Sequence, residues 1–95
     1  GSEMCIRDSR CTADLSIYVD HACRHGGVGQ KLYTEIERLG RERGIENIIS
    51  IITSDNAGSL SFHRKNGFTE VGVMHAVAFK FGKYLDVSFF QKHLD

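Results

Sequence analysis

The sequence predicts a single α/β domain built on a mixed (α+β) sheet, with elements in the order β-α-β-α-β-β. Three features support this fold class: a glycine-rich loop that leads into an amphipathic helix, a nearly continuous apolar segment after that helix, and two β-rich segments at the C-terminal end. With 95 residues, the chain has room for one small domain. Strands joined through helices are expected to be parallel, and the last two strands are expected to form an antiparallel hairpin.

The first strand and the first helix are predicted from hydrophobic periodicity. Residues 14–19, "DLSIYV", alternate apolar and polar side chains and include β-branched and aromatic residues, which is typical of a strand. The helix begins after Gly27 and ends near Gly44, a residue suited to the left-handed conformation of a helix end. Its apolar residues recur with the spacing of one buried face, and we expect them to be core: Val28, Leu32, Ile36 and Leu39.

The second half of the chain contains the remaining elements. Residues 47–53, "NIISIIT", form a nearly continuous apolar run, as expected for a strand that is covered on both faces. Asn56 is among the residues suited to cap a short helix over residues 57–66, and Gly67 is placed to end it. The two hairpin strands are predicted to join at Gly82-Lys83 and to cover residues 69–81 and 84–91.

Charge and composition exclude several classes of partner. The 12 Lys and Arg residues balance the 12 Asp and Glu residues, so the chain has no excess of basic charge for nucleic acid or an anionic membrane. No apolar run approaches the ~18 residues of a membrane span, and no signal peptide is visible. Cys5, Cys11 and Cys23 are odd in number and lack CxxC spacing, which argues against a disulfide framework and fits free thiols in the cytoplasm.

Residues 1–10 are expected to be a non-native or disordered leader. Gly1-Ser2 resembles the remnant of a cloning site, and "EMCIRDSR" after it shows neither helical nor strand periodicity. Within that stretch, "CIRDS" resembles translated sequencing adapter. We therefore expect the folded part to begin near Cys11 or Thr12.

The loop before the first helix, "RHGGVGQ" (residues 24–30), has the composition of a phosphate-binding loop. It is not a Walker loop, because Gly29 is followed by Gln-Lys-Leu and no hydroxyl is placed to reach a magnesium ion. A dinucleotide-binding loop would need a third glycine where Leu32 stands, and an acidic residue where the second strand ends in Ile52-Thr53. The remaining pattern is Arg-x-x-Gly-x-Gly at the start of a helix, where unpaired N–H groups and the helix dipole attract an anion.

This loop resembles the acetyl-CoA-binding loop of the GNAT superfamily of N-acetyltransferases. The resemblance implies that these loop residues bind the pyrophosphate: Arg24, His25, Gly26, Gly27, Val28, Gly29 and Gln30. It continues in "SDNAGSLSFHRKNGF" (residues 54–68), where Asn56 matches the residue that hydrogen-bonds the pantetheine arm. The segment "VAFKFGKYLDVSFFQ" (residues 77–91) and His63 resemble one subgroup, the phosphinothricin and methionine sulfoximine acetyltransferases.

The resemblance implies a GNAT-like acetyl-CoA N-acyltransferase fold, with acetyl-CoA as co-substrate, a small amino-acid-like amine as acceptor, and no metal. The strand before the loop would hold the pantetheine through Ile17, Tyr18 and Val19, with an oxyanion donor at Tyr18 or its neighbour. Asp14 matches the position of a proposed general base, usually Glu, and the alternative is an ordinary strand-end carboxylate. His63 matches the position of a Tyr that protonates the leaving thiolate, and the alternative is a polar lining of the site.

Two further groups of polar residues have simpler explanations. His21, Cys23 and His25 form an H-x-C-x-H string, but their spacing matches no common zinc motif and lies in the phosphate loop. His75 and Lys80 are candidates to face the acceptor, although a solvated strand face is the simpler explanation for both.

The resemblance covers residues 11–95 as the C-terminal, acetyl-CoA-binding part of such a domain, so we expect an N-terminally truncated fold. The helices that form much of the family's acceptor pocket would precede this part. The strand over residues 14–19 would then have an unpaired edge, and we expect a homodimer through that edge. One alternative to the enzyme is a catalytically inactive CoA-binding fragment that folds as an oligomer. Another, a nucleotide-binding module, would bind ATP or NAD better than CoA.

Overall fold

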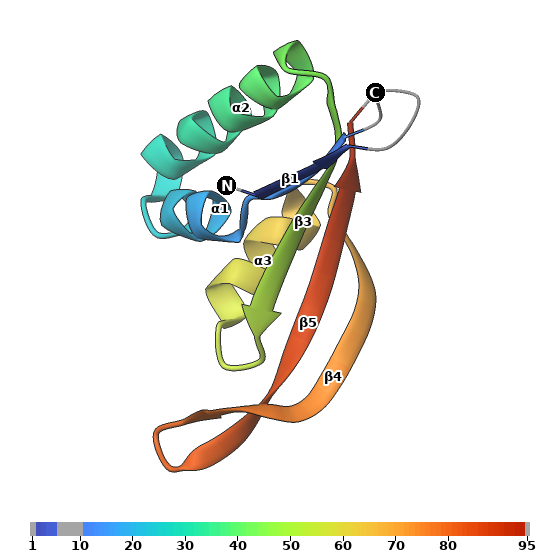
Figure 1. The fold of residues 1–95 in the computed structure, drawn as a ribbon. Coiled ribbons are helices and arrows are strands. Elements are labelled where there is room, and N and C mark those ends of the chain that lie inside the picture. The colour runs from blue at the N-terminus through green and yellow to red at the C-terminus, as the bar shows by residue number, and fades with distance from the viewer. Residues whose placement is uncertain (1, 6–10, 95) are drawn as a thin grey trace.

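The structure is a computed structural model that describes residues 2–5 and 11–94 of the chain. The elements are β1 (Ser2–Cys5), β2 (Cys11–Asp14), α1 (Ser16–Cys23), α2 (Gly26–Glu42), β3 (Ile45–Thr53), α3 (Ala57–Lys65), β4 (Thr69–Lys80) and β5 (Lys83–His93). The strand order in the sheet is β1-β2-β3-β5-β4. Figure 1 shows these helices on one side of the sheet, with the β4–β5 hairpin reaching beyond the body of the molecule.

The sheet is mixed, as the sequence predicts. β2 pairs in parallel with β3, and the crossover between them consists of α1 and α2. β5 pairs antiparallel with both β3 and β4, so the C-terminal hairpin closes the sheet on one side. The α/β class, the parallel front and the hairpin are confirmed, and the crossover contains one helix more than predicted.

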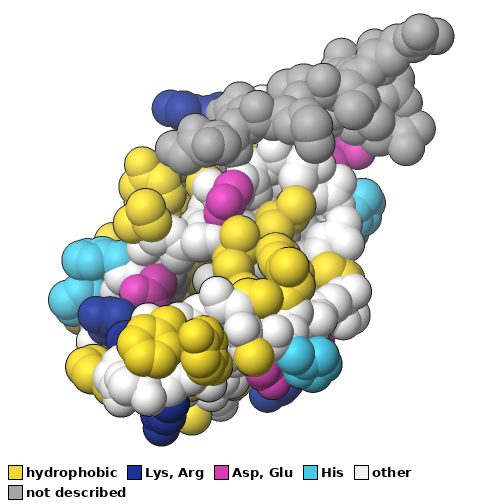
Figure 2. All heavy atoms as spheres, turned by 60° about the horizontal axis from the view of Figure 1, so that its bottom comes forward, with side chains coloured by type: hydrophobic (Ala, Val, Ile, Leu, Met, Phe, Trp, Pro, Cys, Tyr) yellow, Lys and Arg dark blue, Asp and Glu magenta, His cyan; other side chains and the backbone are white. Residues whose placement is uncertain are grey.

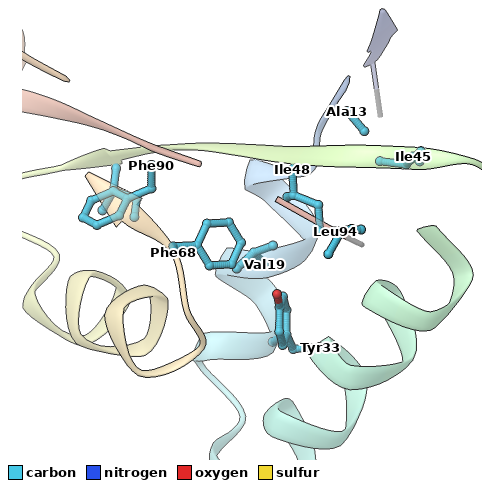
Figure 3. Packing of buried hydrophobic residues seen from close by; sticks show 10 residues of the cluster. Ala13, Val19, Tyr33, Ile45, Ile48, Phe68, Phe90 and Leu94 are labelled. Atoms are coloured by element: carbon cyan, nitrogen blue, oxygen red, sulfur yellow. The ribbon is translucent and has the colours of Figure 1, made fainter. Parts of the chain in front are cut away.

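One face of the sheet carries the core. Along β3, Ile48 and Ile52 are buried whereas Ile51 is 46% exposed, which is the alternation of a strand covered on one face. The prediction that residues 47–53 are covered on both faces was therefore wrong. Figure 3 shows buried side chains packed between the sheet and the helices, among them Val19, Tyr33, Phe68, Phe90 and Leu94.

Residues 14–19 do not form the predicted strand. β2 ends at Asp14, and the residues after Leu15 belong to α1. The segment contains two periodicities, because Leu15, Val19 and Ala22 also follow the i, i+4, i+7 spacing of a helix. Val19 and Ala22 are both fully buried, so this helical face is the one that joins the core. Over so few residues the two spacings compete, and tertiary packing decides between them.

The helix α2 lies where the sequence predicts it, but a different face is buried. Its buried positions are Gly29, Tyr33 and Gly40. Of the predicted core residues, Val28 is 67% exposed, and Leu32 and Leu39 are each 40% exposed. The prediction assumed that the aliphatic side chains of the helix would be buried. The buried face is instead formed by two glycines, which let neighbouring groups come close, and by the aromatic ring of Tyr33.

The predicted ends of the helices are confirmed by their caps. The side chain of Asn56 accepts a hydrogen bond from the backbone N–H of Ser59, with 3.1 Å between the two atoms, and so caps α3. Gly44 and Gly67 have φ values of +78° and +88°, the left-handed conformation that ends α2 and α3. Phe68, directly after Gly67, is buried in the core.

The hairpin of β4 and β5 forms a long arm. Its turn is made by Phe81 and Gly82, with φ values of +52° and +77°, and Lys80 pairs with Lys83 across it. The turn therefore lies one residue before the predicted position at Gly82-Lys83. Exposed hydrophobic side chains of the arm include Val77, Phe79, Phe81 and Tyr84. Figure 2, in which this end of the molecule faces the reader, shows hydrophobic side chains on it.

The edge of β2 is covered by β1. The two strands pair antiparallel, from Ser2 opposite Asp14 to Cys5 opposite Cys11. The expected unpaired edge of a strand over residues 14–19 is therefore absent, and the homodimer predicted through it has no such surface in this structure. That residues 1–10 are a non-native leader stays a prediction, and residues 6–10 lie outside the described part of the chain.

The cysteines differ from the prediction of three free thiols. Cys11 is disulfide-bonded, whereas Cys23 is a free, partly buried thiol. Spacing in the sequence did not reveal that Cys11 is bonded in this way. The cytoplasmic location stays a prediction.

Candidate functional site

A cavity of about 260 Å³ lies beside the C-terminal end of β3, between α1, α3 and the end of β4. Four residues that the sequence assigns to the site line it: Ile17, Arg24, Asn56 and His63. Other polar lining residues are Ser16, Asp20, Thr53, Ser59 and Lys80. Because β2 and β3 are parallel, their C-terminal ends meet at the same edge of the sheet, the edge at which open α/β sheets bind ligands.

Arg24 and Asn56 are both attached to Asp20 of α1. The guanidinium Nη2 of Arg24 lies 3.2 Å from Oδ2 of Asp20. The amide Nδ2 of Asn56 donates to Oδ1 of the same carboxylate, also at 3.2 Å. Since the other end of the Asn56 amide caps α3, this side chain is fixed at both ends. The side chain of Arg24 is 70% exposed, so its guanidinium is open to an anionic ligand.

His63 is buried at the wall of the cavity, with 1% of its surface exposed. Its Nδ1 lies 2.6 Å from the carbonyl oxygen of Ser59, so Nδ1 carries the proton and donates it. The rings of Phe68 and Phe90 lie 4.7 and 5.7 Å from its ring, centroid to centroid. Burial lowers the pKa of His63, against the opposing effects of the Ser59 carbonyl and the Asp20 charge. Nε2 has no hydrogen-bond partner among the described residues.

Asp14 lies at the C-terminal end of β2, next to the cavity lining rather than in it. Its Oδ1 accepts hydrogen bonds from the backbone N–H of Ser16, at 3.1 Å, and from the Ser16 hydroxyl, at 2.6 Å. The same hydroxyl oxygen accepts a hydrogen bond from the backbone N–H of Ile51 at 2.9 Å. These contacts connect the end of β2, the start of α1 and β3, which is the structural role that the sequence left open for Asp14.

The predicted phosphate loop forms the start of α2. The first hydrogen bond of this helix runs from the N–H of Gly29 to the carbonyl oxygen of His25, at 3.1 Å. The three N–H groups before Gly29 therefore have no partner within the helix and lie at the positive end of its dipole. Gly26 is left-handed, with φ of +58°, and a β-carbon on Gly27 would have no neighbour within 4 Å. The open backbone donors of the loop are therefore those of residues 26–28, close to Arg24 in the chain.

The pantetheine-binding strand predicted over Ile17, Tyr18 and Val19 is not present. All three residues belong to α1, and the N–H of Val19 donates to the carbonyl of Leu15 within that helix, at 2.9 Å. The side chain of Val19 lies in the core, and Tyr18 lines a separate hollow beside Leu39. The N–H of Val19 is thus paired within the helix, whereas Tyr18 belongs to the first turn of α1, where N–H groups have no helical acceptor. An oxyanion donor at Tyr18 therefore stays a prediction.

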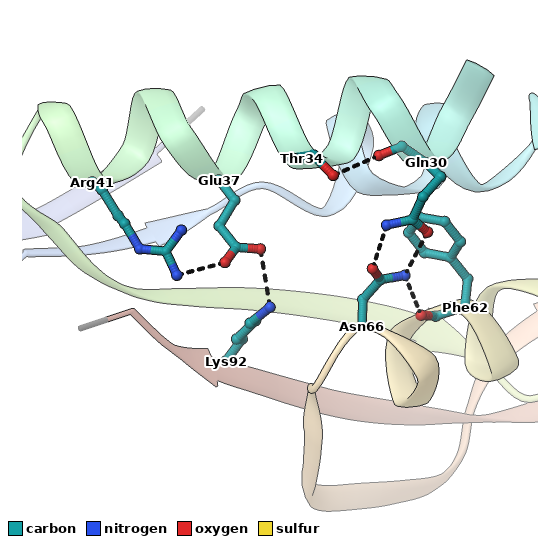
Figure 4. Close-up of polar contacts among 7 residues, drawn as sticks. All are labelled: Gln30, Thr34, Glu37, Arg41, Phe62, Asn66 and Lys92. Atoms are coloured by element: carbon teal, nitrogen blue, oxygen red, sulfur yellow. Dashed lines mark hydrogen bonds and ion pairs between the residues drawn. The ribbon is translucent and has the colours of Figure 1, made fainter. Parts of the chain in front are cut away.

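The remaining loop residues have side-chain contacts away from the cavity. Gln30 exchanges two hydrogen bonds with Asn66, at 2.7 and 3.2 Å, and so ties α2 to α3 (Figure 4). The ring of His25 packs against that of His21, with centroids 4.4 Å apart, and Val28 is exposed. Of these three residues, Val28 has a backbone N–H with no helical acceptor, whereas the N–H of His25 donates to the carbonyl oxygen of Ala22 at 3.2 Å.

The lining also includes residues that the sequence did not assign to the site, among them Asp20 and Ser59. Lys80, which the sequence left as a candidate to face the acceptor or as part of a solvated strand face, lines the cavity too. Asp20 stands four residues before Arg24, the spacing of an ion pair on a helix, and a helical interpretation of residues 16–23 would have found it. Lys80 lies 3.5 Å from Asp55, where a hydrogen bond from Thr53 and the charge of Lys80 lower the pKa of the Asp55 carboxyl. The place of Lys80 in the cavity wall depends on the path of the hairpin.

Residues 3–68, more than half of the chain, match the acetyltransferase (GNAT) family. The chain belongs to the GNAT acetyltransferase family. The matched stretch contains the Arg-x-x-Gly-x-Gly loop and the helix that Asn56 caps, so the resemblance seen in the sequence is confirmed.

Relatives of this GNAT chain support the predicted subgroup. It is 37% identical over 86 residues to the L-methionine sulfoximine/L-methionine sulfone acetyltransferase of Pseudomonas aeruginosa, covering 90% of this chain and 50% of that protein. It is 29% identical to the phosphinothricin N-acetyltransferase of Streptomyces viridochromogenes, and this match covers 88% of this chain and 46% of that protein. YncA of Salmonella typhimurium, solved with its cofactor acetyl-CoA, is 37% identical with a TM-score of 0.69. The match covers 75% of this chain and 41% of YncA. The chain spans about half the length of the curated relatives it matches.

Metal sites and membrane spans were sought in the part of the GNAT chain that the structure describes. Within it, no group of three or more His, Cys, Asp or Glu side chains is placed to hold a metal ion. Its helices are also too short or too polar to cross a membrane.

Proposed function

We propose that this chain binds acetyl-CoA and takes part in acetyl transfer to the amine of a small amino-acid-like acceptor of the phosphinothricin or methionine sulfoximine type. One observation carries the proposal: Arg24, Asn56 and His63, assigned to the site from separate stretches of sequence, line a single cavity. The names of the relatives support the acceptor class. YncA, a relative whose structure holds acetyl-CoA, supports the coenzyme.

The coenzyme would be held mainly through its phosphates. Arg24 supplies an exposed guanidinium, which pairs well with phosphate, and the start of α2 supplies three unpaired N–H groups. The open space around Gly27 allows the pyrophosphate to approach the backbone closely. Nδ2 of Asn56 would donate to a carbonyl of the pantetheine arm once it releases Asp20.

In the transfer itself, the acceptor nitrogen forms a bond to the thioester carbonyl carbon and the bond from that carbon to sulfur breaks. The nitrogen loses a proton, and the departing thiolate gains one. We assign the removal of the proton to Asp14, at the C-terminal end of β2, which as an Asp acts through a water. For His63 the two alternatives differ in a measurable way. As an acid it affects turnover, whereas as a polar lining it affects stability alone.

The second candidate function is coenzyme binding without turnover. It is favoured by the surroundings of the two proposed catalytic residues. Asp14 is engaged by Ser16, and His63 is 1% exposed. An assembly of two chains remains part of this proposal, and elution as a monomer at high micromolar concentration would contradict it.

Calorimetric titration with acetyl-CoA tests the function. Gly27→Glu places a carboxylate where the pyrophosphate is expected, and Gly27→Ala is the matched control, because neither side chain meets a neighbour within 4 Å at its β-carbon. We expect binding by the wild type and by Gly27→Ala, and none by Gly27→Glu. Acetylation of phosphinothricin and methionine sulfoximine then separates the enzyme from the binding unit. Absence of binding by the wild type would contradict both candidates.

A further inference from the structure

Asp20 holds both side chains to which the proposed function assigns the coenzyme. One oxygen of its carboxylate lies 3.2 Å from the guanidinium of Arg24, and the other accepts a hydrogen bond from Asn56 at 3.2 Å. The amide oxygen of Asn56 caps α3, so its NH₂ group is the part left for a ligand. One carboxylate therefore engages a donor of each of the two residues.

The charge of Asp20 also stands out in the cavity wall. Among the described residues that line the cavity, it supplies the one carboxylate, facing the two cations Arg24 and Lys80. Lys80 has its own partner, Asp55, at 3.5 Å. A phosphate that pairs with Arg24 would come close to the Asp20 carboxylate, and two negative charges in one site repel each other.

The pair of Asp20 and Arg24 is suited to exchange. The two side chains are 36% and 70% exposed, and exposed ion pairs of this kind are weak. A phosphate offers the guanidinium two oxygens at once and a larger charge, which makes it the stronger partner. The carboxylate can thus keep Arg24 at the cavity mouth and still give it up when a phosphate arrives.

We propose that Asp20 is a positioning residue that sets the affinity of the site for phosphate-bearing ligands, by holding Arg24 and Asn56 in place and competing with the phosphates of the ligand for Arg24. This inference rests on the proposed coenzyme binding. Its consequence is selective: removal of the negative charge strengthens the binding of coenzyme A and leaves the binding of pantetheine, which lacks the phosphates, unchanged.

The test compares the wild type with Asp20→Asn in calorimetric titrations with coenzyme A and with pantetheine. The Asn side chain keeps its size and an oxygen that accepts from Asn56, but it has no charge for Arg24. We expect coenzyme A to bind roughly three- to tenfold more tightly to Asp20→Asn, a range that corresponds to the loss of one exposed ion pair and of one like-charge contact. Pantetheine affinity should change by less than about twofold.

Two controls make the result specific. Glu35→Gln, on the exposed face of α2 beside Arg38, changes the net charge equally at a site outside the cavity and should leave both affinities unchanged. In an Arg24→Gln background, Asp20→Asn should bring no gain, because the competition is gone. Asp20→Gln, which also keeps an uncharged acceptor and is a better helix former than Asp, is the second variant should Asp20→Asn unfold.

The outcomes separate the two proposals. A wild type that binds coenzyme A with no gain in either Asp20 variant overturns the inference and leaves the proposed function standing. An equal gain in Glu35→Gln, or an equal gain for pantetheine, also overturns it. Absence of coenzyme A binding by the wild type overturns the proposed function and the inference together.

Discussion

A β-carbon placed on Gly29 would lie 1.6 Å from the carbonyl oxygen of Ala22, so α1 and α2 meet backbone against backbone at this point. Gly27, two residues earlier in the same motif, has no neighbour within 4 Å of such a carbon. The two glycines of the Arg-x-x-Gly-x-Gly pattern thus have different tasks. Gly29 allows the helices to approach, and Gly27 keeps the helix start open.

The first prediction concerns Gly29→Ala. The methyl group would collide with a backbone atom that cannot move without separating α1 from α2. We expect the variant to lose roughly 2–4 kcal/mol of unfolding free energy, although Ala is otherwise the better helix former. Urea denaturation of the wild type and the variant measures this difference in unfolding free energy. Gly58→Ala in α3, with no neighbour within 4 Å, is the control and should be neutral or slightly stabilising. A Gly29→Ala variant as stable as the wild type would show that the two helices are not in contact there.

Elements with strong local signals were predictable from the sequence. β3 is a long apolar run, and α3 has an Asn that caps it and a Gly that ends it, so no distant contact is needed to define either. The predicted grouping of Arg24, Asn56 and His63 was possible for a similar reason, since each residue belongs to a recognisable local motif.

Features decided by packing were not predictable. Residues 14–19 contain strand and helix periodicities together, and burial of Val19 and Ala22 selected the helix. The buried face of α2 depends on the close approach at Gly29, which composition does not show. The role of Asp20 was hidden for the same reason, because a strand would have placed its side chain differently from the helix that brings it to Arg24.

The second prediction separates the two tasks of Asn56, which caps α3 and donates into the cavity. Asn56→Ala removes both, and should lower the unfolding free energy by about 1 kcal/mol and weaken coenzyme A binding. Asn56→Ser keeps an oxygen for the cap but shortens the donor. We therefore expect stability close to the wild type in thermal or urea denaturation, with binding weakened as in Asn56→Ala. Full binding by Asn56→Ser would mean that the amide group of Asn56 does not contact the ligand.

The third prediction is a pH dependence that originates in His63. Burial lowers its pKa in the folded state, against smaller opposing effects of Ser59 and Asp20, so the unfolded chain takes up the proton first as the pH falls. The unfolding free energy should therefore decrease below about pH 6.5, by at most about 1.4 kcal/mol per pH unit. His63→Phe keeps a ring beside Phe68 and should remove this slope, whereas His93→Asn at an exposed position should retain it. Urea denaturation at several pH values between 8 and 5 measures the slopes, and equal slopes in the wild type and His63→Phe would contradict the assignment.

The fourth prediction concerns the ion pair of Glu37 and Lys92, which joins α2 to β5 (Figure 4). Nζ of Lys92 lies 2.9 Å from Oε2 of Glu37. The side chain of Glu37 is only 13% exposed and that of Lys92 only 20%. Burial alone would raise the pKa of Glu37, but the contacts with Lys92 and Arg41 bring it below its ordinary value. A lowered pKa means that this contribution is fully present above about pH 4.3 and is lost as the pH falls through the folded-state value.

Glu37→Gln should therefore destabilise the protein at pH 7 and matter less in acid. At neutral pH we expect a loss of about 1–3 kcal/mol, because the ammonium of Lys92 stays largely buried without its counter-charge. Below the folded-state pKa of Glu37 the wild type loses the same interaction, so the two stability curves should converge. Glu42→Gln, which removes an exposed partner of Arg38 from the same helix, is the matched control and should cost less than about 1 kcal/mol at any pH. Parallel curves for the wild type and Glu37→Gln from pH 7 to pH 3 would show that the carboxylate of Glu37 is not what holds Lys92 in place.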